Sequence, residues 1–168
     1  VRVLPVDVCH SHWQCTLEAP LQPLRGVAHP QPAVRLGLNR VAHLGKAAAL
    51  RIQEQAAQSP WRDVADLAIR AQLDKQAMEA LAAADALRSL ACHRRQQMWD
   101  AAAQTSLPPI FAQSAIHEPQ LVLPEAKEGE EIMFDYAATG LTLRRHPLAL
   151  LRDKLTRHGL KTAAELRQ

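Results

Sequence analysis

Aromatic side chains are scarce in this chain of 168 residues and make up only 4% of it. A β-sandwich draws heavily on aromatic and β-branched residues, whereas the Ala and Leu that dominate here favour short packed helices. Long hydrophobic runs are missing too, since none approaches the ~20 residues that a membrane-spanning helix requires. The composition therefore predicts a mainly α-helical fold, in one domain or two small ones, with no membrane partner.

Cysteine is also rare, and an odd number of three argues against a framework of disulfide bonds. This fits the reducing cytoplasm, where we expect the protein to act, and no signal peptide is visible. Charge of one sign is not in excess, because 20 Lys and Arg stand against 17 Asp and Glu, for a net charge of +3. A nucleic-acid-binding function would therefore depend on a local basic patch.

Two of the cysteines belong to the stretch VDVCHSHWQCTLE, which brings Cys9, His10, His12 and Cys15 close together. Structural zinc sites mostly use Cys-x2–4-Cys and His-x3–5-His pairs, and neither spacing is present here. If the stretch is a strand, the two thiols share one face and the two imidazoles the other. We therefore expect a strand without a metal, and a zinc site formed by an intervening turn is the alternative.

The chain divides by pattern into four segments. Residues 1–36 look extended, because apolar and polar residues alternate on both sides of a Pro-rich connection. Residues 37–103 predict four or five short helices joined by tight turns, one of them capped by Asp74. Residues 104–129 hold four prolines and predict an irregular linker, after which residues 130–168 return to helices. Since residue 1 is Val and the end is abrupt, we expect a piece of a longer protein.

The stretch VAHLGKAAALRI has the pattern of a helix-hairpin-helix motif. Gly45 in the turn would permit a left-handed backbone and a close approach to a phosphate. The free N–H groups at the start of the next helix would point at that phosphate, and the helix dipole favours an anion. Ala49 and Ile52 would pack the two helices together. An ordinary αα-hairpin, which also places Gly in its turn, is the alternative.

Basic residues near helix starts favour the phosphate hypothesis. Lys46 lies at a helix N-terminus, where a cation costs ~0.3–1 kcal/mol unless an anion binds there. A second stretch, QLDK, has a similar outline without glycine, so packing is the better interpretation and any phosphate contact rests on Lys75. His93, Arg94 and Arg95 form a small basic cluster, which is either a solvated surface or an extension of the phosphate track.

Four blocks of the sequence carry a resemblance to a known family: VRVLPVDVCHSHWQCTLE, AVRLGLNRVAHLGKAAALRI, EALAAADALRSLACHRRQQMW and DYAATGLTLRRHPLALLR. In this order they resemble the error-prone C-family DNA polymerases of the ImuC type, which are relatives of the bacterial DNA polymerase III alpha subunit. The insertion between ATG and HPL resembles the error-prone branch. Two positions depart from the family, which usually has Gly at His43 and Asn at Cys9. A position that relatives fill with Asn is a poor place for a required zinc ligand.

The resemblance implies a mainly α fold with a tandem helix-hairpin-helix domain, a short N-terminal β-containing segment and a C-terminal helical extension. Residues 1–36 would end the fingers region, 37–103 would form the DNA-binding domain, 104–129 the linker, and 130–168 a helical segment leading to an absent OB-fold. The carboxylates that hold Mg²⁺ in the full-length polymerase would lie upstream. The fragment is thus expected to bind duplex DNA, to hold no cofactor and to catalyse nothing.

The resemblance also implies a role and partners. The full-length enzyme would be a DNA-directed DNA polymerase in translesion synthesis, damage-induced mutagenesis and DNA repair. ImuB-type and ImuA-type proteins would be its partners, with the sliding clamp reached indirectly rather than through Gln104 to Phe111. The alternative function is a protein–protein interaction module that docks ImuB-type partners. The expected DNA contacts are Arg40, His43, Leu44, Gly45, Lys46, Ala47, Lys75, Arg94 and Arg95.

Overall fold

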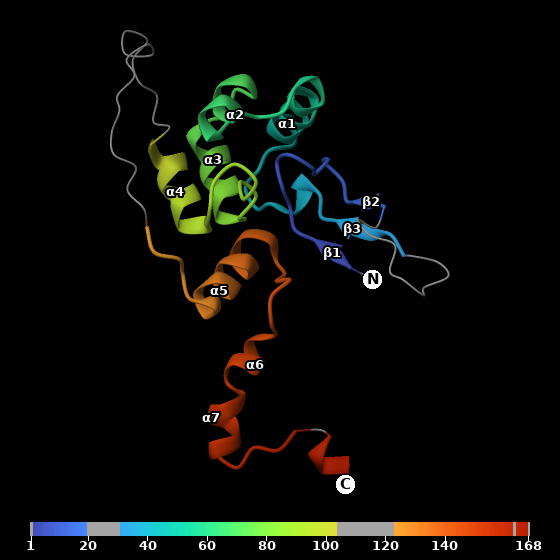
Figure 1. Ribbon diagram of the computed structural model, residues 1–168, viewed down its shortest axis with the longest axis vertical. Coiled ribbons are helices and arrows are strands. Elements are labelled where there is room, and N and C mark those ends of the chain that lie inside the picture. Colours follow the sequence, from blue (N-terminus) through green and yellow to red (C-terminus); the bar gives the residue numbers. More distant parts are fainter. Residues whose placement is uncertain (1, 20–30, 104–122, 163, 168) are drawn as a thin grey trace.

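The computed structural model describes residues 2–19, 31–103, 123–162 and 164–167, and it is mostly helical beside a small sheet (Figure 1). The sheet contains β1 (Val3–Leu4), β2 (Thr16–Glu18) and β3 (Ala33–Arg35) in the order β1-β3-β2. β1 runs parallel to β3, whereas β2 runs antiparallel to it. The prediction of a mainly α fold with a short N-terminal β-containing segment is confirmed.

The stretch between β1 and β2 is a turn, so the prediction of a strand through Cys9 and Cys15 is wrong. Its centre is Asp7, which is 7% exposed. The main-chain carbonyl of Asp7 accepts the N–H of Ser11 at 2.7 Å, and its carboxylate accepts the N–H of Cys9 at 2.8 Å. An Asp side chain that bonds its own backbone two residues on stabilises a turn in place of a strand.

The helical part begins with a 3-10 turn, η1 (Leu38–Arg40), where the pattern predicted a full helix. α1 (Lys46–Gln58), α2 (Val64–Arg70), α3 (Lys75–Ala83) and α4 (Arg94–Ala103) follow, as predicted for this region. Their apolar positions lie in one hydrophobic core, which also takes in Val6, Val8 and Leu36 from the N-terminal segment. The core thus crosses the predicted boundary between residues 36 and 37. The domain boundaries themselves remain a prediction.

The C-terminal part holds α5 (Glu128–Thr139), α6 (Pro147–Leu150), α7 (Arg152–Arg157) and a last 3-10 turn, η3 (Glu165–Arg167). α5 packs against α3 and ends at Gly140, which has a left-handed φ of 75°. Figure 1 shows α6 and α7 extending away from the remaining helices. Most of the predicted linker, including Gln104 to Phe111, lies outside the described residues.

Candidate nucleic-acid interface

Two helix starts in the structure have the same local backbone. The sequences HLGK and QLDK each begin with a residue of positive φ, which is 64° at His43 and 48° at Gln72. Two residues later comes the N-cap of the following helix, Gly45 for α1 and Asp74 for α3. A lysine is the first helical residue in both cases. The two hairpins are therefore a structural repeat that differs at the N-cap.

In the first hairpin the left-handed residue is His43, and the prediction that Gly45 takes this conformation is wrong. Gly45 has φ −67° and ψ 141°, an extended conformation open to any residue. The reversal occurs two residues before the helix, and Leu44 then turns into the core, where it is 7% exposed. His is among the residues that tolerate positive φ better than most.

The start of α1 is open to solvent. A Cβ atom placed on Gly45 would meet nothing within 4 Å. Among the described residues, no acceptor bonds the N–H groups of Lys46, Ala47 or Ala48, and no side chain caps the helix. Lys46 and Ala47 are exposed. Unpaired N–H groups at a helix N-terminus, beside a free cation, form a ready binding place for an anionic oxygen.

The start of α3 is closed by its own side chain. The carboxylate of Asp74 accepts the N–H of Ala77 at 2.8 Å, as the sequence predicted for this cap. Nearby, the ammonium of Lys75 lies 3.8 Å from the carboxylate of Glu79. The place that a phosphate would take is thus already occupied by a negative charge.

Two arginines that the sequence did not single out join the hairpins. Arg51 on α1 donates to the carbonyls of Ala71 at 2.8 Å and Gln72 at 3.0 Å. Both carbonyls belong to the turn before α3. Arg70 on α2 donates to the carbonyl of Gln55 at 2.9 Å, near the end of α1. All three bonds connect residues at least 15 positions apart, and no local pattern marks such partners.

Arg40 lies next to the first turn but has a partner within the chain. Its guanidinium donates to the carbonyl of Thr139 at 3.1 Å, at the end of α5. Two residues on, the N–H of Ala42 donates to the carbonyl of Ala138 at 2.7 Å. The end of α5 is therefore hydrogen-bonded to the residues just before His43, and Arg40 supplies one of the two bonds.

Arg94 and Arg95, which the sequence groups together, have different surroundings. Arg94 is 2% exposed and forms ion pairs with Glu131, at 2.9 Å, and with Asp135. Arg95 is half-buried and pairs with Glu130 at 2.9 Å on the surface. A guanidinium that is buried between carboxylates cannot reach DNA without breaking these pairs, so the burial of Arg94 speaks against its expected role in a phosphate track.

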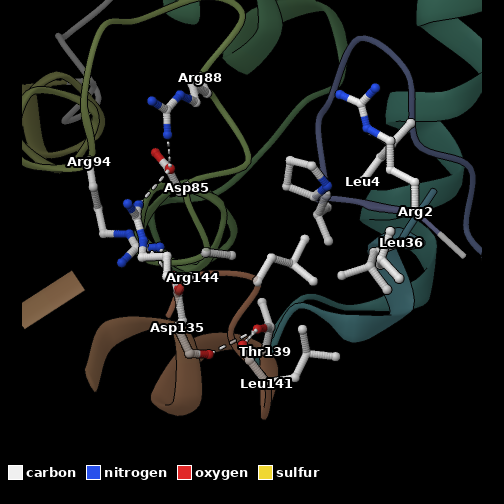
Figure 2. Close-up of a pocket in the computed structure, with 15 residues that line it drawn as sticks. Arg2, Leu4, Leu36, Asp85, Arg88, Arg94, Asp135, Thr139, Leu141 and Arg144 are labelled. Atoms are coloured by element: carbon white, nitrogen blue, oxygen red, sulfur yellow. Dashed lines mark hydrogen bonds and ion pairs between the residues drawn. The ribbon is translucent and has the colours of Figure 1, made fainter. Parts of the chain in front are cut away.

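The ion pairs border a cavity of 280 Å³ between β1, the segment after α3, and α5. Figure 2 shows Arg94, Asp135 and Arg144 on one side of this cavity and Leu4 and Leu36 on the other. The residues of the first turn, 43–48, do not line it. The cavity therefore lies apart from the open helix start.

The zinc alternative would place Cys9, His10, His12 and Cys15 around one ion. Within the described residues, no group of three or more His, Cys, Asp or Glu side chains could hold a metal ion. Burial and the neighbouring carboxylate of Asp7 raise the pKa of the Cys9 thiol to about 11. Since zinc binds the thiolate, this environment disfavours Cys9 as a ligand.

Comparisons with known proteins agree with the hairpin geometry. The family described as "Helix-hairpin-helix motif" matches residues 1–97. The chain is 42% identical to an error-prone DNA polymerase of Methylococcus capsulatus, covering 100% of this chain and 17% of that protein. Error-prone DNA polymerases of Bordetella parapertussis and Aromatoleum aromaticum are 48% and 47% identical, over 99% of this chain and 15% of their own lengths. The chain thus spans about a sixth of these curated relatives. In the part of the chain that the structure describes, no helix is long and apolar enough to cross a membrane.

Proposed function

The chain belongs to the helix-hairpin-helix family, and we propose that it is the duplex-DNA-binding segment of an error-prone DNA polymerase. The observation that carries this proposal is the open start of α1, where three N–H groups and Lys46 lack a partner among the described residues. A backbone phosphate placed there would accept these N–H groups and meet the positive end of the helix dipole. Binding through phosphates is independent of base sequence.

The expected contacts are assigned in part. Gly45, Lys46 and Ala47 hold the phosphate, Gly45 because its missing side chain leaves the approach open. His43 forms the turn beside them, and its side chain is exposed. Leu44 contributes only its backbone, because its side chain is in the core.

The remaining expected contacts have partners within the chain. Arg40 is left out of the phosphate site because the carbonyl of Thr139 accepts its guanidinium, and Arg94 because buried carboxylates hold it. Lys75 is left out because the carboxylate of Asp74 closes the start of its helix. Arg95 stays a peripheral candidate, since its pair with Glu130 is exposed and costs little to exchange.

The longer protein would be a DNA-directed DNA polymerase that acts in translesion synthesis and DNA repair in the cytoplasm. Its divalent metal ions, expected to be Mg²⁺, would lie outside this segment, whose described residues offer no metal-binding group. ImuB-type and ImuA-type proteins would be its partners. The names of the relatives and the hairpin repeat support this assignment.

Docking of an ImuB-type partner through this segment is a second candidate, favoured by exposed apolar side chains on α5. Met133 is 74% exposed and borders a hollow with Phe134 and Ala137. Clustered apolar residues at the surface mark interaction sites. Met133→Ser should weaken capture of the purified ImuB-type protein at fixed salt, whereas Leu17→Ser, at another exposed leucine, should not. Equal capture by both variants would remove this candidate.

A salt titration of duplex binding tests the main proposal. The logarithm of the affinity should fall linearly with the logarithm of the salt concentration, with a slope of about −0.9 for each phosphate contact. Lys46→Ala should weaken binding and make the slope shallower by about 0.9, because it removes one contact. The readout is a gel-shift titration at several salt concentrations, with duplexes of unrelated sequence.

Lys75→Ala is the matched control, since Lys75 takes the same position at the start of α3. This variant should leave both the affinity and the slope unchanged. Identical behaviour of the two lysine variants, or binding that does not respond to salt, would show that the start of α1 is not the phosphate site.

A further inference from the structure

The backbone of the first turn is held from outside the hairpin. His43 has a φ of 64°, a conformation that a residue other than glycine keeps only where the surrounding structure enforces it. Within the turn, the N–H of Leu44 donates to the carbonyl of Val41 at 3.4 Å. Two shorter bonds come from α5: the carbonyl of Ala138 accepts the N–H of Ala42, and the carbonyl of Thr139 accepts the guanidinium of Arg40. These are two of the last carbonyls of α5, which have no partner within their own helix.

The left-handed residue of the second hairpin is held by a different kind of contact. Gln72, its left-handed residue, has its carbonyl bonded by Arg51 of α1 at 3.0 Å. The turn at Gln72 is therefore held by a side chain of the hairpin pair itself. The turn at His43 depends on a helix that begins 85 positions later in the chain.

The ionic side of the cavity holds α5 in place. Arg94 on α4 pairs with Glu131 and Asp135 of α5, and Arg144 reaches the same two carboxylates at 2.9 and 3.4 Å. Figure 2 shows Asp135 and Thr139 on the same helix, with the carboxylate beside Arg144. Because these pairs are largely buried, a shift of α5 would separate charges at considerable cost. The end of α5 thus has a defined position against the turn.

We propose that α5 is a positioning element for the phosphate site, and that Arg40 is a latch between α5 and the first turn, not a phosphate ligand. This inference rests on the proposed DNA-binding function. By holding Ala42 and Arg40, the end of α5 keeps His43 in its left-handed conformation. The N–H groups of α1 then point into solvent together, ready for one phosphate.

Two glycines allow a matched test of the latch. Gly140 ends α5 with a φ of 75°, and Gly159 follows α7 with a φ of 76°. Alanine is strained at either place, and the strain is relieved by unwinding the last turn of the helix. Gly140→Ala should weaken duplex binding about tenfold, which corresponds to ~1.4 kcal/mol. Gly159→Ala should not, because within the described residues no hydrogen bond of α7 reaches the hairpin.

The variant Arg40→Ala distinguishes a positioning role of Arg40 from a direct contact with phosphate. It should weaken duplex binding at every salt concentration while the slope of the salt titration stays that of the wild type. Hydrogen exchange at the amide of Ala42 reports the latch directly, and it should accelerate in Arg40→Ala and Gly140→Ala but not in Gly159→Ala.

Several results would contradict the positioning role of α5 and Arg40. A slope made shallower by about 0.9 in Arg40→Ala would make Arg40 a phosphate ligand and overturn the inference. Equal loss of affinity in the two glycine variants would overturn it as well, as would faster exchange at Ala42 with unchanged affinity. If Lys46-dependent binding survives the loss of the latch, only this inference falls. If the wild type shows no salt-dependent binding, the proposed function falls with it.

Discussion

The two hairpins of this protein have the same turn conformation, but the helices that follow begin differently. The start of α1 is open to solvent, whereas the start of α3 is capped by a side chain. His43 and Gln72 take the left-handed conformation, Leu44 and Leu73 follow, and a lysine begins each helix. Gly45 leaves the start of α1 open, whereas the carboxylate at the equivalent position in α3 satisfies its own helix. The lysine therefore does not distinguish the two sites. The N-cap residue decides whether a helix end is available to a ligand or already paired within the chain.

The core packing that the two hairpins have in common can be tested by substitution. Ile52 and Leu81 lie seven residues after their N-caps, and both are 0% exposed. Replacing either with Ala should lower the free energy of unfolding by ~2–5 kcal/mol, because the lost contacts leave a cavity in a common core. Denaturant unfolding of the two variants measures this. A large cost for one and none for the other would mean that the hairpins are not equivalent in packing.

The difference at the N-cap can be tested by placing the Asp of the second hairpin at position 45 of the first. Gly45→Asp should reduce duplex affinity at least tenfold, or ~1.4 kcal/mol, because the carboxylate would pair with the helix N–H groups and repel phosphate. The free energy of unfolding should change little, since Asp and Gly are both favourable N-caps.

Gly45→Asn separates the two causes of that loss. Asn would cap the helix without a negative charge, so it should weaken binding less than Asp does. Duplex titration of the two variants beside the wild type gives the answer. Unchanged affinity in Gly45→Asp would contradict the assignment of this helix start to a phosphate.

The reverse exchange should produce the smallest effect. Asp74→Gly frees the start of α3, costs a few tenths of a kcal/mol in stability, and should raise duplex affinity severalfold at low salt. The control is Asp63→Gly, which removes the cap that Asp66 uses at the start of α2 without opening the hairpin turn. A gain of affinity in both variants would indicate a general loss of negative charge instead of a new phosphate contact.

Local features of the site were predictable from the sequence. The turn before Lys46, the cap at Asp74 and the buried positions Ala49 and Ile52 depend on neighbours within a few residues, and the structure has them in place. The pattern of the residues alone pointed to Gly45 for the left-handed conformation, because glycine is the default for positive φ. The structure places this conformation at His43, where the resembling family usually has Gly.

Long-range partners were beyond a local pattern. Arg94 reads as part of a basic surface, yet its partners stand 37 and 41 positions further along the chain. Cys9 and Cys15 read as a strand, but the carboxylate and main-chain carbonyl of Asp7 turn the chain there. Such cases depend on which segments meet in space.

By itself, the sequence determined the helical class and the starts of α1 and α3, because hydrophobic spacing and capping act over one or two turns. Only the tertiary structure decided which charges are free. It buried Arg94 between carboxylates of α5 and bonded Arg40 to the end of that helix, while Lys46 stayed exposed. The physical reason is that a charge is available to a ligand only if no segment folded against it supplies the opposite charge or a carbonyl.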